Sequence, residues 1–196
     1  MRNVSYEAKV TLVGVTPMLM HKAGNIDNKS VASATTDYSE EWVKTCYTNN
    51  GNGNIMIPSM NIEAMLMSAG KGKKLGKQFL SRIMATGARL VEFDVPLMYD
   101  GDQVTIDRIR ENNWLFTCNV KINTNKATVM RTRSCIPMGW SLTFTMQILN
   151  PLLKPEILRQ LLDEAGYEVG MFDWRPGSPK PGKFGQFELA QFEVSA

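Results

Sequence analysis

The chain contains few of the residues with which proteins build disulfide frameworks or metal sites. Its 196 residues include three cysteines, Cys46, Cys118 and Cys135, and a single histidine, His21. An odd number of cysteines without CxxC spacing predicts neither a disulfide scaffold nor a zinc knuckle, and it fits a reducing, cytoplasmic setting. One histidine among scattered carboxylates specifies no metal site. We therefore expect no metal and no other cofactor.

Long apolar runs and nucleotide-binding motifs are also missing. No segment approaches the roughly 18 continuous apolar residues of a membrane-spanning helix, and residues 1–8 lack the apolar stretch of a signal peptide. The sequence contains neither GxxxxGK(S/T) nor GxGxxG, and Ser59 lacks the GxSxG frame of a hydrolase. We expect an intracellular protein without a membrane span.

Positive charge is unevenly distributed along the chain, although the formal net charge is only +3. The stretch between Glu63 and Glu92 contains six Lys and Arg residues and no acid, and the stretch between Glu111 and Glu156 contains five and no acid. This segregation favours a positive face for an anionic partner. The alternative is an ordinary solvated surface whose acidic neighbours come close on folding.

Apolar periodicity predicts the secondary structure. Alternation predicts strands over Tyr6–Val13, Arg89–Leu97, Trp114–Ile122, Ser141–Leu149 and Phe187–Val194. Helical spacing predicts helices from an N-cap at Ser59 to Gly70, from Phe79 to Gly87, and from Pro155 to a stop at Gly166. Asn and Gly at 49–53 predict a hairpin between 43–48 and 54–57, and 22–39 reads as a long surface loop.

The order of these elements predicts the fold class. Strand, helix, strand, strand, helix, strand (βαββαβ) is the α+β, ferredoxin-like pattern, in which two helices cover one face of an antiparallel sheet. A chain of 196 residues with 43% hydrophobic content can form one compact domain. We predict a single domain over 1–196, with inserted loops and hairpins near 22–54 and 99–135.

Three stretches carry a family resemblance. The first strand runs into Thr16-Pro17-Met18-Leu19, Ile57-Pro58-Ser59 opens a helix, and Gly182-Lys183-Phe184-Gly185-Gln186-Phe187 lies near the C-terminal end. In this order, the chain resembles the RAMP superfamily, the repeat-associated proteins of CRISPR effector complexes. The resemblance implies a ferredoxin-like fold and a nucleic-acid partner. It fits either a backbone subunit of such a complex or a stand-alone viral or mobile-element relative, which would act in the host cytoplasm.

Three basic segments are candidates for the binding surface. Glycines in the first, 70–77, leave the backbone open to a phosphate chain. The second, 121–133, resembles the thumb hairpin with which RAMP backbone subunits separate segments of guide RNA, and we expect it to form one site with the first if both fold over the same sheet edge. In the third, 173–184, aromatic rings can stack on unpaired bases. The predicted nucleic-acid-binding residues are Lys71, Lys73, Lys74, Lys77, Arg82, Lys121, Lys126, Arg131, Arg133, Trp174, Arg175, Lys180, Lys183 and Phe184.

The predicted function is non-enzymatic binding of single-stranded nucleic acid, RNA in the first place and DNA as the alternative. Binding would be mainly to the phosphate backbone, with possible assembly into an oligomer or a ribonucleoprotein complex. One alternative is a metal-independent endoribonuclease that uses His21 as general acid or base, and the resemblance suggests Asp27 as a further catalytic candidate. Another alternative is a viral protein that reuses the fold to bind another protein.

Overall fold

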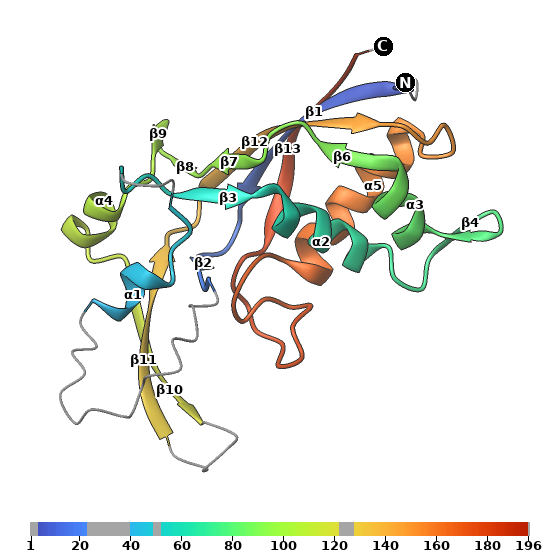
Figure 1. Ribbon diagram of the computed structural model, residues 1–196. Helices are drawn as coiled ribbons and strands as arrows, with labels where there is room; N and C mark the ends of the chain where they lie inside the picture. Colours follow the sequence, from blue (N-terminus) through green and yellow to red (C-terminus); the bar gives the residue numbers. More distant parts are fainter. Residues whose placement is uncertain (1–3, 23–39, 49–51, 122–127, 196) are drawn as a thin grey trace, which may run out of the picture.

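An antiparallel sheet forms the centre of the computed structural model, which describes residues 4–22, 40–48, 52–121 and 128–195 (Figure 1). Its strands lie in the order β13 (Phe187–Ser195), β1 (Tyr6–Gly14), β12 (Trp140–Ile148), and β6 (Ala88–Leu90) pairs with the far edge of β12. The same edge of β12 also pairs, at its other end, with β8 (Met98–Tyr99), which pairs in turn with β9 (Asp102–Gln103).

Alternating side chains explain why the central strands form a two-faced sheet. In β12, Leu142, Phe144, Met146 and Ile148 are buried while the residues between them are exposed or half-buried. The neighbouring β1 follows the same rule, and its buried Val10 lies opposite Phe144. A period of two places the buried apolar side chains of both strands on one face, and this face meets the helices.

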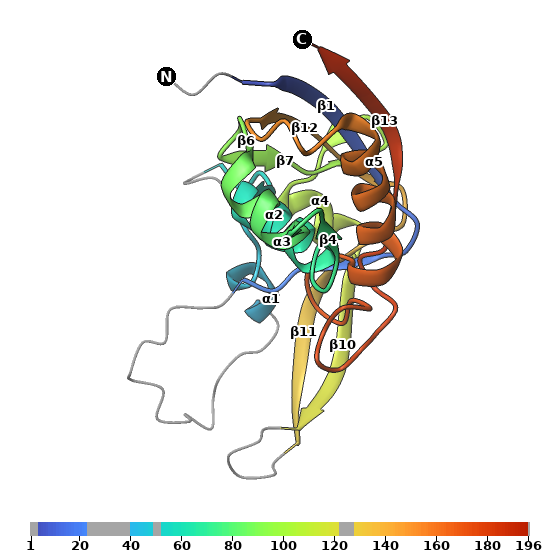
Figure 2. The ribbon, with the colours of Figure 1, turned by 90° about the vertical axis from the view of Figure 1, so that its right-hand side faces the viewer.

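Helices cover that face of the sheet (Figures 1 and 2). They are α2 (Ser59–Ala69), α3 (Leu80–Gly87) and α5 (Pro155–Glu164), and each buries an apolar stripe, such as Leu158, Leu161 and Leu162 of α5. The chain therefore runs β1, α2, β6, β12, α5, β13, and the strand order β13-β1-β12-β6 is that of a split βαβ fold. The predicted ferredoxin-like fold class is confirmed.

The remaining elements lie outside this ferredoxin-like core. They are β2 (Met18–Leu19), α1 (Glu41–Lys44), β3 (Met56–Pro58), the hairpin of β4 (Lys74–Leu75) and β5 (Gln78–Phe79), β7 (Asp94–Pro96), α4 (Ile106–Glu111), and the hairpin of β10 (Leu115–Lys121) and β11 (Thr128–Ile136). None of the helices in the described part of the chain is long and apolar enough to span a membrane.

Four local predictions were wrong. Ser59 is not the N-cap of α2, because it is the first residue of the helix and Pro58 occupies the N-cap position without a side-chain hydrogen bond. The helix α5 does not stop at Gly166, because the chain continues as a π-helical turn, η1 (Ala165–Val169), and ends at Gly170 with a φ of 66°. A Cβ at Gly166 would lie 2.1 Å from the carbonyl oxygen of Phe187, so this glycine permits close packing on β13 and does not end the helix.

The other two differences concern strands. The stretch 89–97 forms two strands, because β6 pairs with β12 whereas β7 pairs with β3. The first arm of the expected hairpin at 43–57 contains the end of helix α1, and the described residues of the two arms pair at the bridge between Thr48 and Ile55. The predicted turn and the predicted long loop lie outside the described residues at 49–51 and 23–39.

Candidate nucleic-acid interface

The hairpin of β10 and β11 projects away from the sheet (Figures 1 and 2). Its pairing runs from Leu115 opposite Ser134 to Lys121 opposite Thr128. At its base β11 pairs with β2, which fixes the hairpin beside His21. The hairpin tip at 122–127, with Lys126, lies outside the described residues, as does the alternative catalytic residue Asp27.

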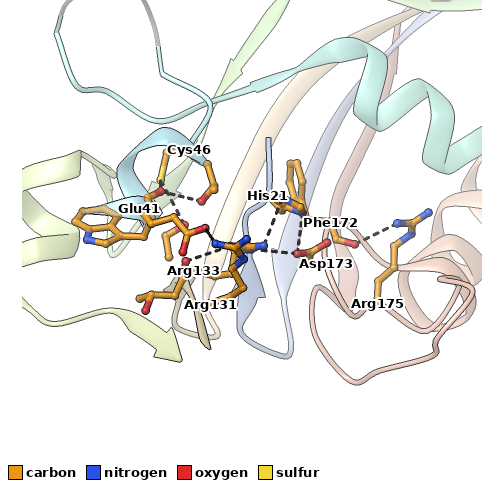
Figure 3. Close-up of polar contacts among 12 residues, drawn as sticks. His21, Glu41, Cys46, Arg131, Arg133, Phe172, Asp173 and Arg175 are labelled. Carbon is orange, nitrogen blue, oxygen red and sulfur yellow. Dashed lines mark hydrogen bonds and ion pairs between the residues drawn. The ribbon is translucent and has the colours of Figure 1, made fainter. Parts of the chain in front are cut away.

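A polar cluster lies at the base of this hairpin (Figure 3). Nδ1 of His21 lies 3.1 Å from Oδ2 of Asp173, Nε of Arg133 lies 3.4 Å from the same oxygen, and Nη2 of Arg133 lies 3.4 Å from Nε2 of His21. A guanidinium can only donate, so Nε2 accepts and Nδ1 carries the proton that is donated to Asp173. Both ring nitrogens of His21 therefore have partners.

The electrostatics of Asp173 follow from this arrangement. Burial alone would raise the pKa of this carboxyl group, but the hydrogen bonds and charges of His21 and Arg133 outweigh burial, so the pKa is lowered from its ordinary value of 3.8. The cluster thus holds an ionised carboxylate against one permanent cation and one imidazole.

Folding brings carboxylates to several cations of the acid-free stretches. Arg131 pairs with Glu41 at 2.6 Å, and Arg133 pairs with Asp173. Lys73 forms an ion pair with Glu164, and the hydrogen bond from Lys73 is the main reason that the pKa of the Glu164 carboxyl is lowered. Part of the charge segregation in the sequence is therefore neutralised in the folded protein.

Aromatic side chains gather where the hairpin meets the segment 173–184. The ring of Phe116, from β10, lies 5.7 Å from Trp174 and 5.3 Å from Phe184, between ring centroids. Trp174 remains 37% exposed. The two predicted stacking residues thus belong to one cluster, the aromatic cluster, and sequence reasoning missed its third member, Phe116. Its position in a strand of the predicted basic hairpin was the available signal.

Glycines set the path of the Gly-rich loop, residues 173–186. A Cβ at Gly185, whose φ is 68°, would lie 2.0 Å from the carbonyl oxygen of Met171, and one at Gly182 would lie 2.0 Å from that of Trp174. The loop therefore closes on its own backbone. Lys180 and Lys183 are exposed on it, while Arg175 donates a 3.1 Å hydrogen bond to the carbonyl oxygen of Phe172.

A pocket of about 240 Å³ opens beside the polar cluster. Four separate segments of the chain line it, and its residues are His21, Tyr47, Asn61, Ala64, Met65, Gly170, Met171, Phe172, Asp173 and Arg175. Sequence reasoning missed Tyr47 and Asn61, because nothing in the local sequence marks residues that only folding brings to His21. We call this cavity the His21 pocket.

The remaining predicted residues lie elsewhere. Lys71 follows α2, Lys73, Lys74 and Lys77 belong to the β4–β5 hairpin region, and Arg82 lies on α3. In Figure 1 this hairpin and the β10–β11 hairpin lie at opposite ends of the molecule. The two basic segments do not fold over the same sheet edge, so the condition on which they were expected to form one site is not met; α2 and α3 carry the first segment to the far side of the helical layer. Among the described residues, no group of three His, Cys, Asp or Glu side chains is arranged to hold a metal ion.

Comparisons with known proteins give a likeness in fold. No family model matches the sequence, and no curated protein matches it. A chain from the solved structure "Cryo-EM structure of the Type III-B Cmr-beta bound to cognate target RNA" superposes with a TM-score of 0.58 at 14% sequence identity, covering 96% of this chain and 60% of that one. The two chains therefore share a fold, and the likeness is one of fold alone. The protein therefore spans 60% of the length of that structural neighbour.

Proposed function

We propose that the protein binds single-stranded nucleic acid, RNA in preference to DNA, without catalysis, on the face formed by the β10–β11 hairpin and the Gly-rich loop. The observation that carries the proposal is the aromatic cluster, with Trp174 exposed, beside the exposed Lys180 and Lys183. The structural neighbour, whose complex is bound to target RNA, supports RNA as the ligand.

The chemistry of this face suits an unpaired strand. Bases stack on aromatic side chains with about 1–3 kcal/mol each, and such stacking needs bases that are free of a duplex. Lysines on an exposed loop attract phosphates irrespective of base sequence. Lys71, Lys74, Lys77 and Arg82 are also exposed, but they lie on the far side of the helical layer and outside this face.

Filter binding at several salt concentrations tests this proposal. Single-stranded RNA should bind with strongly salt-dependent affinity, duplex DNA should bind less well, and Trp174→Ala should weaken binding about fivefold or more because one stacking partner is lost. Val194→Ala, an exposed apolar substitution on β13, is the control. If neither RNA nor single-stranded DNA binds at low salt, the proposal fails and a protein partner becomes the favoured ligand.

A metal-independent endoribonuclease is the second candidate, and the His21 pocket is the observation in its favour. His21 is oriented by Asp173, as a general base is oriented by a carboxylate, and Tyr47 lines the same pocket. Incubation of labelled RNA with the protein in EDTA decides between the candidates. Specific cleavage that is lost in His21→Ala would replace binding by catalysis, whereas intact RNA supports the binding protein.

A further inference from the structure

We propose that the His21 pocket receives one unpaired nucleobase of the bound strand and reads the edge of that base through Asn61. This inference rests on the proposed function, because the strand must first be bound nearby. Asn61 lies in the first turns of α2 and lines the pocket, and its Nδ2 is buried without a hydrogen-bond partner among the described residues. A buried donor without an acceptor costs free energy, which an acceptor on a ligand would recover.

The walls of the pocket suit a flat ring. Tyr47 and Phe172 both line it, and their ring centroids lie 5.8 Å apart at an interplanar angle of 43°. Phe172 has a φ of 62°, a left-handed conformation that bulky residues rarely adopt. The chain thus holds this ring at the pocket despite a backbone conformation of higher energy.

The charges of the pocket favour a neutral polar group over a phosphate. Asp173 contributes an ionised carboxylate to the lining, and this carboxylate would repel an anion. His21 and Arg133 already hydrogen-bond to it, so the cluster offers no free cation that would attract a phosphate into the pocket. Arg175 lines the same pocket and is half-buried, and its guanidinium already donates a hydrogen bond to the carbonyl oxygen of Phe172.

The size of the pocket agrees with a single base. Its volume of about 240 Å³ lies below the range of roughly 300–1,000 Å³ that is typical of pockets for drug-sized ligands. Side-chain amides distinguish bases by donating to and accepting from one base edge, and one good pair of this kind discriminates against the wrong base by about tenfold or more.

The single histidine of the chain makes the test direct. Because His21 is the only histidine, its imidazole proton signal in a one-dimensional NMR spectrum reports on the pocket without assignment. AMP, CMP, GMP and UMP are titrated separately at fixed pH, with ribose 5-phosphate as the probe that has the sugar and phosphate but no base. We expect a saturable shift of the His21 signal, with the preferred nucleotide binding about tenfold tighter than the weakest, and no shift with ribose 5-phosphate.

Variants on adjacent positions of α2 separate the pocket from the fold. Asn61→Leu should abolish the shift without lowering the melting temperature, because it replaces an amide whose buried Nδ2 has no partner among the described residues by an apolar group of similar size. Met60→Leu, at a residue that is 74% exposed, should behave as the parent. If no nucleotide moves the His21 signal of the parent, or if ribose 5-phosphate moves it equally, the inference is wrong. If that same protein still binds RNA in the filter assay, the proposed function stands although the inference has failed. If the His21 signal shifts in a base-dependent way but RNA does not bind, the pocket binds nucleotides and the proposed function fails.

Discussion

At Asp173, side chains from three distant parts of the sequence meet around one carboxylate. His21 follows β2, Arg133 belongs to β11, and Asp173 begins the Gly-rich loop, so these contacts join the hairpin to the body of the protein. Arg133 is only 13% exposed, and a cation with so little access to water depends on its partner. The cluster is therefore expected to stabilise the proposed binding face.

Replacement of Asp173 by Asn tests this role. The variant should lose about 1–2 kcal/mol of unfolding free energy at pH 7, because Arg133 loses its charged partner near a partly exposed surface. The folded-state pKa of Asp173 is lowered, so its contribution is present above the unfolded pKa of about 3.9 and is lost as the pH falls through the lower folded value. Urea unfolding at pH 7 and pH 3 should show the gap narrowing in acid, and an equal gap at both pH values would contradict this account.

Tyr6 provides the opposite pH dependence. Burial, with the charge of Glu156 acting in the same direction, raises its pKa to about 12, and its hydroxyl donates a 2.8 Å hydrogen bond to the carbonyl oxygen of Leu153. Tyr6→Phe should cost about 1 kcal/mol at pH 7. The contribution of Tyr6 is complete below its unfolded pKa of about 10 and declines as the pH rises towards the folded value. Thermal unfolding should therefore show a smaller difference between the proteins at pH 11 than at pH 7.

Residues of the candidate site were only partly predictable from the sequence. Trp174, Phe184 and the loop lysines stand out locally, because aromatic and basic residues are interleaved with Gly and Pro. Tyr47, Asn61 and Phe116 carry no such signal, because the residues that they meet are distant in the sequence. Phe116 contacts Trp174, and Tyr47 and Asn61 line one pocket with residues of the segment 170–175.

Among the elements, those with strict periodicity were predicted well. The strand β12 and the helix α2 follow from their apolar spacing, because burial on one face determines both. The helix α1 and the turn η1 could not be predicted from apolar spacing, because such short helical turns are determined by the residues against which they pack. The sequence shows where the glycines of the Gly-rich loop lie. Only the structure distinguishes the glycines at which a Cβ would collide with backbone atoms from those at which a Cβ would face open space.

Two glycines with similar conformations test this distinction. Gly185 and Gly76 have φ values of 68° and 61°, but a Cβ at Gly185 would lie 2.0 Å from a backbone oxygen whereas nothing lies within 4 Å of one at Gly76. Gly76→Ala should cost only the left-handed conformation, about 1–2 kcal/mol. Gly185→Ala adds the collision and should cost about 3 kcal/mol or more. Equal losses in chemical denaturation would show that the Gly-rich loop relaxes freely.

On the scale of the whole molecule, the arrangement of charge differs from its arrangement in the sequence. The order of elements was enough to predict the ferredoxin-like fold, because the split βαβ pattern allows few topologies. It did not reveal that the two basic segments separate, or that Glu41, Glu164 and Asp173 reach cations distant in sequence. Surface electrostatics depend on where charged side chains lie in the folded protein, and the local sequence does not determine these positions.

The central claim is that the strand lies on the face of the hairpin and the Gly-rich loop, and paired lysine variants of equal charge test it most directly. Lys180→Gln with Lys183→Gln removes two exposed cations from the loop, and Lys71→Gln with Lys77→Gln removes two exposed cations from the far side. Both double variants change the net charge equally, so a general loss of positive charge would affect them alike.

The measurement is the dependence of RNA affinity on salt concentration for the parent and both variants. The account predicts that the loop variant binds single-stranded RNA more weakly than the far-side variant and that its log–log salt slope falls by about 1.4, as expected for two lost phosphate contacts on a single strand. Equal losses in the two variants, or a larger loss in the far-side variant, would contradict the account.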